Sequence, residues 1–262
     1  MPYDDWKRWR QHGIGGSDVA TICGLNKYKS AFQLWAEKTG RYDDEIESSE
    51  SAYWGHQLEP VICAEFTKRT GLTVMLEQNL LQHEKYPWML ANLDGIVQSA
   101  DAKYIFEAKT AGAYRLQEWD QNYVPYPYQL QVQHYMAVTG FVGTYVAVLI
   151  GGQEFRINYI GRDDEIINML IKLESQFWQY VENNIPPPVD GSEAAKDFVN
   201  SRYPSSIAKK SIILDDAYIS LVDDYERYQE QEKEIAKLKD KAANQLKEFI
   251  GDCEIATAEL RK

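Results

Sequence analysis

Apolar residues alternate with short polar and glycine-containing segments through most of the chain, and this pattern predicts several strands. The runs 91–97 and 104–110 are rich in aromatic, branched and apolar residues and are bounded by turn formers, as strands usually are. The polar segment 98–103 between them predicts a hairpin turn. A second hairpin is expected across Gly151 and Gly152. The expected strands are 72–81, 91–97, 104–110, 142–150 and 154–160.

Other segments carry apolar residues at spacings of three and four, which predicts helices. Ser17 and Ser30 stand where a side chain can cap the first turn of a helix. In the helix expected from Trp54 onward, Pro60 predicts either a kink or a helix start close to it, and we expect Trp54 itself in the core. The expected helices are 3–11, 18–23, a segment from Ser30 to about Gly40, 54–69, 126–139, 163–182 and 215–249.

The last expected helix, 215–249, is long and strongly charged, yet apolar residues recur along it at spacings near three and four. Such spacing predicts a seam that packs against a partner helix or against the protein's own core. A solitary solvated helix of this length would be only marginally stable. The apolar residues of the seam are Tyr225, Tyr228, Ile235, Leu238, Ala242 and Phe249.

The first predicted hairpin also carries the side chains that suggest chemistry. Alternate side chains of a strand share a face, so Glu107 and Lys109 point the same way. If the hairpin folds symmetrically about Ala100 and Asp101, Asp94 lies opposite Glu107. Two carboxylates and a lysine on one patch of sheet can bind a hard cation such as magnesium and cleave a phosphodiester. The alternative interpretation is an ordinary cross-strand salt bridge on a solvated face.

Composition and charge narrow the class of protein. With 44% hydrophobic residues the chain can bury a core, and no apolar run is long enough to span a membrane. The N-terminus lacks the features of a signal peptide, and three widely spaced cysteines indicate reduced thiols in a cytoplasmic protein. The net charge of −12 argues against a general nucleic-acid coat, because DNA affinity comes largely from neutralising phosphates. It still allows a nuclease with a local basic lining.

Four blocks, Arg10–Asp18, Gly55–Pro60, Leu93–Gly95 with Phe106–Lys109, and Tyr128–Gln133, occur in this order over roughly residues 8–140. Together they resemble the YqaJ-type viral recombinase nucleases, a family similar to phage lambda exonuclease within the superfamily that has the PD-(D/E)XK core. The proline of that name is replaced here by Leu93, at a position that varies in the group. The resemblance implies an α/β (α+β) fold with a mixed central β-sheet flanked by helices. We place the nuclease core at 1–204 and a long helical C-terminal extension at 205–262.

The resemblance also implies the metal site. Asp94, Glu107 and Glu59 resemble the family's metal ligands, joined by the backbone carbonyl of Ala108, and Lys109 resembles its catalytic lysine. From its sequence position alone, Glu59 could equally be a surface glutamate of a helix. The ions implied are Mg²⁺, or Mn²⁺ as a substitute, with two ions per site.

A second set of residues resembles the family's contacts to DNA. Arg10 and Ser17 resemble the pair that receives the 5′-phosphate, and we place Tyr128 with them. Gln131 resembles a glutamine near the scissile phosphate, with Gln133 as a weaker candidate. An arginine fork and the free N–H groups of a helix start both suit a phosphate. The simpler alternatives are a plain helix cap, a surface charge and a polar helix face.

The expected activity is a magnesium-dependent 5′→3′ exodeoxyribonuclease that leaves 3′ overhangs for phage-type recombination by single-strand annealing. The resemblance implies double-stranded DNA ends as substrate, a single-strand annealing protein as partner, a ring-shaped homotrimer, no membrane association, and a phage or prophage protein in the bacterial cytoplasm. One alternative is a related PD-(D/E)XK endonuclease. The other is a non-catalytic DNA-binding or assembly protein of the same fold, against which the intact Asp94, Glu107 and Lys109 set argues.

Overall fold

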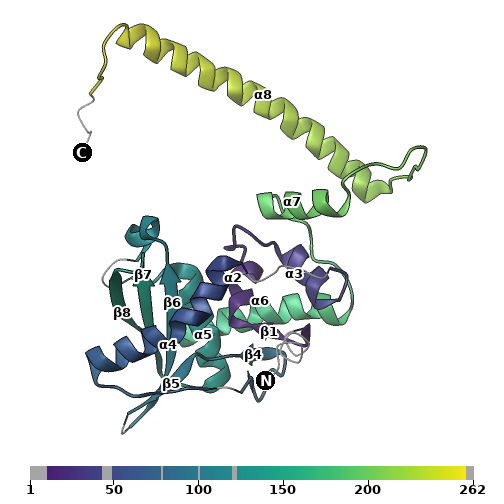
Figure 1. Cartoon of the computed structure of the whole chain (residues 1–262). Helices are drawn as coiled ribbons and strands as arrows, with labels where there is room; N and C mark the ends of the chain where they lie inside the picture. The colour runs from purple at the N-terminus through teal and green to yellow at the C-terminus, as the bar shows by residue number, and fades with distance from the viewer. Residues whose placement is uncertain (1–10, 43–48, 78, 100, 120–122, 258–262) are drawn as a thin grey trace. The chain divides into compact units, whose positions relative to one another are not determined.

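The structure is a computed structural model that describes residues 11–42, 49–77, 79–99, 101–119 and 123–257. The chain divides into two compact units, Met1–Pro204 and Ser205–Lys262. Figure 1 labels their helices and strands. The helix expected over 3–11 lies almost entirely outside the described residues, as does Arg10.

A five-stranded sheet forms the centre of the first unit, with the strand order β2-β5-β6-β7-β8. The β6 and β7 strands run parallel, whereas every other neighbouring pair is antiparallel, so the sheet is mixed as the resemblance implied. The strands are β2 (Val74–Met75), β5 (Gly95–Gln98), β6 (Lys103–Ala111), β7 (Gly143–Ile150) and β8 (Glu154–Gly161).

The two predicted hairpins are both confirmed. In the first, Gly95 pairs with Phe106 and Gln98 with Lys103, a register that is symmetric about residues 100 and 101. In the second, Gly151 and Gly152 have φ values of 59° and 70°, which only glycine adopts easily. The β5–β6 register places the position before Gly95 next to Glu107, which is the arrangement that the candidate site requires.

A second, three-stranded sheet has the order β1-β4-β3 and consists of β1 (Ile14–Gly15), β3 (Leu81–Gln82) and β4 (Met89–Ala91). The prediction of one strand over 72–81 is therefore wrong, since its two ends belong to different sheets. The Glu77 side chain accepts hydrogen bonds from both the backbone and the side-chain nitrogen of Asn79, at 2.9 Å each. Such a local bond competes with strand pairing and turns the chain between the sheets.

Helix ends follow the predicted signals in most places. Ser30 caps α3 through the N–H of Gln33, as predicted. Ser17 is not a cap, because α2 already begins at Gly16, where the Asp18 side chain accepts the N–H of Gly15 at 3.0 Å. The helices of this unit are α2 (Gly16–Ile22), α3 (Ala31–Lys38), α4 (Glu50–Thr70), α5 (Tyr126–Thr139), α6 (Asp164–Glu182) and α7 (Glu193–Arg202), with a 3₁₀ helix η1 (Ala113–Glu118).

The α4 helix differs from its predicted form. It begins at Glu50, capped by Ser49, and continues through Pro60, so a helix start near the proline is excluded. Ile62 and Phe66 are buried as their spacing predicted, but Trp54 is 55% exposed and is not part of the core. The turns of α4 before the proline still approach the sheet, since a Cβ at Gly55 would lie 3.8 Å from Thr110 Oγ1 of β6.

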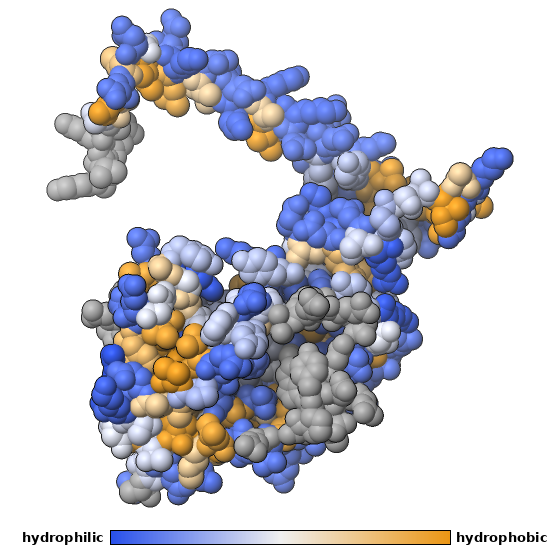
Figure 2. Space-filling view, viewed as in Figure 1, coloured by the Kyte–Doolittle hydropathy of each residue, from blue (hydrophilic) through white to orange (hydrophobic). Residues whose placement is uncertain are grey.

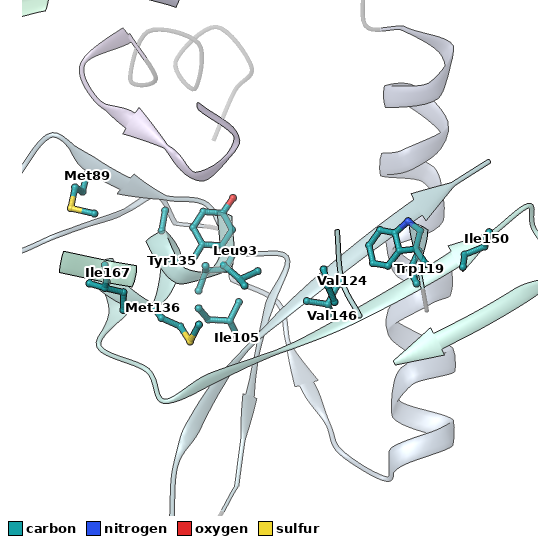
Figure 3. Packing of buried hydrophobic residues seen from close by; sticks show 14 residues of the cluster. Met89, Leu93, Ile105, Trp119, Val124, Tyr135, Met136, Val146, Ile150 and Ile167 are labelled. Atoms are coloured by element: carbon teal, nitrogen blue, oxygen red, sulfur yellow. The ribbon is translucent and has the colours of Figure 1, made fainter. Parts of the chain in front are cut away.

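Helices cover both faces of the five-stranded sheet (Figure 1), and the alternation of β6 shows how. Ile105 packs with Val132 and Met136 of α5 in one cluster (Figure 3). Phe106 packs with Phe66 of α4 in another. Burial of such side chains stabilises each layer by about 2 kcal/mol per residue. Because both faces are covered, Glu107 in the middle of β6 is buried although it is polar.

The second unit is dominated by α8 (Asp216–Ile250), whose first turn is capped by the Asp215 side chain. None of its residues is buried. No helix in the described part of the chain combines the length and the apolar character that a membrane span requires. Cys23, Cys63 and Cys253 are free thiols, the first two half-buried rather than fully in the core.

Candidate active site

The β5–β6 hairpin brings the two predicted acids together. Asp94 stands directly before β5, and its Oδ2 accepts the backbone N–H of Ala108 at 2.8 Å. Glu107 is 2% exposed although it is a carboxylic acid. Its neighbours on β6, Phe106 and Ala108, pack into the α4 side of the sheet. Glu107 therefore points to the opposite face, as the strand alternation predicted.

Lys109 and Gln131 complete a hydrogen-bonded triangle with Glu107. Glu107 Oε1 accepts from Lys109 Nζ at 2.6 Å and from Gln131 Nε2 at 2.7 Å, and Gln131 Oε1 accepts from Lys109 Nζ at 3.2 Å. Glu107 Oε2 is buried and has no hydrogen-bond partner among the described residues. A buried carboxylate oxygen without a partner is costly, and a ligand that binds it would remove the cost.

The electrostatics of the site match those of an acidic cluster. Burial and the neighbouring Asp94 raise the pKa of Glu107 to about 8, although Lys109 opposes the shift. Burial raises the pKa of Asp94, and burial together with Asp94 raises the pKa of Glu59. Burial alone would lower the pKa of Lys109, but the Glu107 and Asp94 carboxylates outweigh it and raise that pKa. A divalent cation would favour the ionised form of all three acids.

Glu59 reaches the cluster from α4 and lies close enough to Asp94 and Lys109 for both charges to act on its pKa. Its side chain is 38% exposed, and its Oε1 lies 2.9 Å from Nδ1 of His56, one turn earlier. No role was predicted for His56, although the spacing of three residues on a helix predicts such a pair. In the part of the chain described, no group of three or more histidine, cysteine, aspartate or glutamate side chains is placed so that it could hold a metal ion.

These residues nevertheless fit a hard divalent cation. Magnesium is held by one or two carboxylates and completes its shell with water and substrate phosphate oxygens, so an open acidic site suits it better than a closed cage. Asp94 and Glu107 are such carboxylates. Glu107 Oε2 has no hydrogen-bond partner among the described residues and is therefore available to coordinate an ion. The Ala108 carbonyl remains a predicted ligand.

Two aromatic rings adjoin Lys109, and Arg115, which was not predicted as a site residue, contacts one of them. The Lys109 ammonium stands 5.0 Å from the centre of the Tyr128 ring, which stacks on Trp119 at 5.4 Å. The Arg115 side chain of η1 forms two hydrogen bonds to Glu118 and interacts with Tyr128, and both contacts raise its pKa. Sequence reasoning missed Arg115, and its place shortly after Lys109 was the only available signal.

Ser17 borders a small cavity next to this cluster. The cavity has a volume of about 90 Å³ and is lined by Gly15, Gly16, Ser17, Leu80, Leu90, Asn92 and Tyr135. Tyr135 links the cavity to the acids, because its hydroxyl accepts a hydrogen bond from Gln131 Nε2 at 3.1 Å. Tyr128 does not line this cavity and lies against Lys109 instead. Arg10 is outside the described residues.

A buried ion pair holds α5, and with it Gln131, against the rest of the unit. His134 Nδ1 lies 2.9 and 3.0 Å from the two carboxylate oxygens of Glu174 on α6. Its Nε2 lies 3.0 Å from the Leu90 carbonyl of β4. Both ring nitrogens thus face oxygen atoms that accept hydrogen bonds, an arrangement that favours the doubly protonated imidazolium. Neither residue is exposed to solvent.

Comparison with known proteins shows to which family this chain belongs. A family model described as a YqaJ-like viral recombinase domain matches residues 5–142. The chain belongs to the YqaJ-like family. Within the family, the uncharacterized protein YqaJ of Bacillus subtilis (strain 168) is 39% identical over 257 residues, which cover 97% of this chain and 80% of that protein.

Two solved structures share the fold of this YqaJ-like chain. An alkaline exonuclease, LHK-Exo from Laribacter hongkongensis, has a TM-score of 0.59 at 20% identity and matches 76% of this chain and 100% of its own. A phage related exonuclease from Haemophilus somnus 129PT has a TM-score of 0.53 at 14% identity, with 69% and 98% covered. These likenesses confirm the predicted α/β fold with its mixed sheet between helices.

Proposed function

We propose that this YqaJ-like protein is a divalent-metal-dependent exonuclease that degrades one strand of duplex DNA in the 5′→3′ direction. The observation that carries the proposal is the buried Glu107, whose Oε2 has no hydrogen-bond partner among the described residues although Asp94 and Lys109 adjoin it. A buried carboxylate oxygen left without a partner indicates a function beyond an ordinary salt bridge. Family membership and the fold shared with exonucleases support the same conclusion.

The side chains divide the work of phosphodiester hydrolysis. Asp94 and Glu107 would hold a magnesium ion, with Glu59 and the Ala108 carbonyl completing the proposed set. A bound ion supplies an acidified water and neutralises charge on the phosphate. The Lys109 ammonium donates hydrogen bonds to Glu107 Oε1 and to Gln131 Oε1, and its positive charge can stabilise negative charge that develops on the phosphate.

The proposed polarity rests on the cavity beside Ser17. Only the Tyr135 side chain would separate a 5′-phosphate bound there from Gln131, which in turn contacts Glu107. Arg10 would provide the second contact. We further propose that the 3′ overhangs pass to a single-strand annealing protein and that the nuclease units assemble as a ring around the duplex. A ring with an acidic exterior would accommodate the net charge of −12.

The decisive test is nucleotide release from blunt, 5′-phosphorylated duplex with magnesium. Asp94→Asn should lower the rate at least ~100-fold, because one such electrostatic contact is worth ~10² or more in rate. Asp101→Asn, an exposed residue in the turn of the same hairpin, serves as the matched control and should keep the wild-type rate. The proposal is wrong if the wild type releases no nucleotides, or if Asp94→Asn and Asp101→Asn release them at equal rates.

Polarity and end dependence need separate substrates. In a duplex with a 5′-phosphate on one strand only, that strand should be degraded, and a label at the 3′ end of the other strand should stay in a full-length product. Removal of the 5′-phosphate should slow the reaction. Rapid cleavage of covalently closed circular DNA would instead favour an endonuclease of the same core. Metal-independent DNA binding without turnover would favour the non-catalytic alternative.

A further inference from the structure

The α8 helix carries an unbroken heptad pattern that nothing in its own unit covers. Along this pattern the a and d positions are apolar except for Glu232 and Lys239. Figure 2 shows apolar residues recurring along the helix between polar ones. Phe249 is 90% exposed and Tyr225 is 67% exposed. The a positions are Tyr218, Tyr225, Glu232, Lys239 and Leu246, and the d positions are Leu221, Tyr228, Ile235, Ala242 and Phe249.

The two charged a positions discriminate between the ways in which two copies of α8 could pair. In a parallel, in-register pair each a position faces itself, so Glu232 would meet Glu232 of the partner subunit and Lys239 would meet Lys239 of the partner subunit. Both contacts would place like charges in the seam, which costs several kcal/mol in an interface. A parallel homodimer is therefore disfavoured by the residues that occupy its centre.

An antiparallel pair removes both conflicts. With the two-fold axis between Lys233 and Glu234, every a position faces a d position of the other copy. Glu232 then lies one layer from Lys239 of the partner subunit, on the same side of the seam, so opposite charges adjoin. The facing pairs are Tyr218 with Phe249, Leu221 with Leu246, Tyr225 with Ala242, Tyr228 with Lys239, and Glu232 with Ile235.

Small residues flank the same axis. In an antiparallel pair the e positions of the two helices lie on the same side of the seam, and with this axis Ala236 lies nearest in level to Gln229 of the partner subunit. Val222 lies nearest in level to Ala243 of the partner subunit. These pairs place no like charges beside the seam. The pattern extends over more than four heptads, beyond the length that usually marks a coiled coil.

We propose that α8 pairs with α8 of a second copy of this chain as a symmetric antiparallel coiled coil. The occupant of the exposed face is thus the same helix in reverse direction. This inference does not depend on the proposed nuclease activity, because no residue of the acidic cluster takes part. The inference holds for monomeric nuclease units and for units that are already assembled, because the pairing of α8 joins two particles in both cases.

Sedimentation equilibrium of the full chain measures the pairing. Ile235→Asp, at a central d position, should halve the particle mass at micromolar concentration. Lys237→Glu, an f position on the outer face of the same helix, is the matched charge control and should leave the mass unchanged. Equal masses for the wild type and Ile235→Asp would overturn the proposal and indicate that α8 packs on its own unit or on a different partner.

A charge-reversal cycle tests the direction of pairing. Glu232→Lys alone and Lys239→Glu alone should each raise the dissociation constant at least about tenfold, because each puts like charges one layer apart. The double variant should restore the wild-type value, since it only exchanges the two signs. A parallel pair has like charges facing in all four proteins, so absence of rescue would contradict the antiparallel arrangement.

The native Cys253 provides an independent readout, because it lies just beyond the end of α8. In the antiparallel pair the two Cys253 thiols are roughly 50 Å apart, given a rise of about 1.5 Å per residue. Mild oxidation should therefore leave wild-type chains unlinked. Efficient linkage of the wild type through Cys253 would indicate a parallel pair and overturn the proposal.

Discussion

At the scale of single residues, the site is defined by carboxylates whose surroundings resist their ionisation. Glu107 has a pKa of about 8 because it is buried beside Asp94, and its second oxygen has no hydrogen-bond partner in the described part of the chain. Such an arrangement is unfavourable for stability alone, which is why it indicates function. His134 shows the opposite case, a buried titratable group whose every polar atom is satisfied.

The His134–Glu174 pair leads to a pH-dependent prediction. Burial alone would lower the pKa of His134, but Glu174 and the Leu90 carbonyl raise it above its usual 6.5. The stabilisation is complete below about pH 6.5 and is lost as pH rises through the folded-state pKa. Replacing His134 by Gln should cost about 3 kcal/mol at pH 6 and clearly less at pH 9.

Thermal unfolding of both proteins across that pH range provides the measurement. His56→Gln is the control, because His56 is exposed and its partner Glu59 is half-exposed. A penalty for His134→Gln that stays constant from pH 6 to pH 9 would show that the imidazolium is not the stabilising species.

At the scale of elements, the acidic cluster depends on how closely α2 approaches α5. A Cβ added to Gly16 would lie 2.4 Å from the Tyr135 ring and 3.0 Å from Gln131 Cγ. Glycine is therefore required for close packing here, since its φ lies outside the left-handed region. The first sequence block thus supports the position of Gln131 through contact as well as bordering the cavity.

Gly16→Ala should destabilise the protein by about 1–3 kcal/mol, as overpacking usually does, and should displace Gln131 from Glu107. Gly191→Ala is the matched control, because a Cβ at Gly191 meets nothing within 4 Å. Chemical denaturation gives the free energy of unfolding, and the rate on duplex DNA reports the displacement. Wild-type stability together with wild-type rate in Gly16→Ala would show that the contact has no role.

Local signals in the sequence predicted the elements that local physics controls. The β5–β6 register followed from the polar turn, and α5 followed from its spacing and from Gly140, whose φ is 71°. Three features escaped prediction because contacts distant in sequence decide them. The 72–81 segment divides between two sheets, α4 extends past Pro60, and Arg115 reaches Tyr128 from a 3₁₀ turn. The approach of Asp94 to Glu107 was predictable from the hairpin register, whereas the His56–Glu59 contact was not predicted.

At the scale of the whole molecule, the acidic cluster belongs entirely to the first unit, and α8 contributes no buried residue. A chain that ends at Pro204 should therefore keep its thermal transition within a few degrees of the full chain and should release nucleotides at a comparable rate. Calorimetry and the duplex assay measure these two quantities. Failure of 1–204 to fold would show that the helical unit stabilises the core.

The length of α8 sets the spacing of the two YqaJ-like units in the proposed antiparallel pair. An α-helix of 35 residues is about 50 Å long, close to the length of 15 base pairs of duplex. In that pair the two helices run in opposite directions, so their YqaJ-like units are attached at opposite ends of the rod. If the proposed activity also holds, one such particle acts on two duplex ends at a fixed separation.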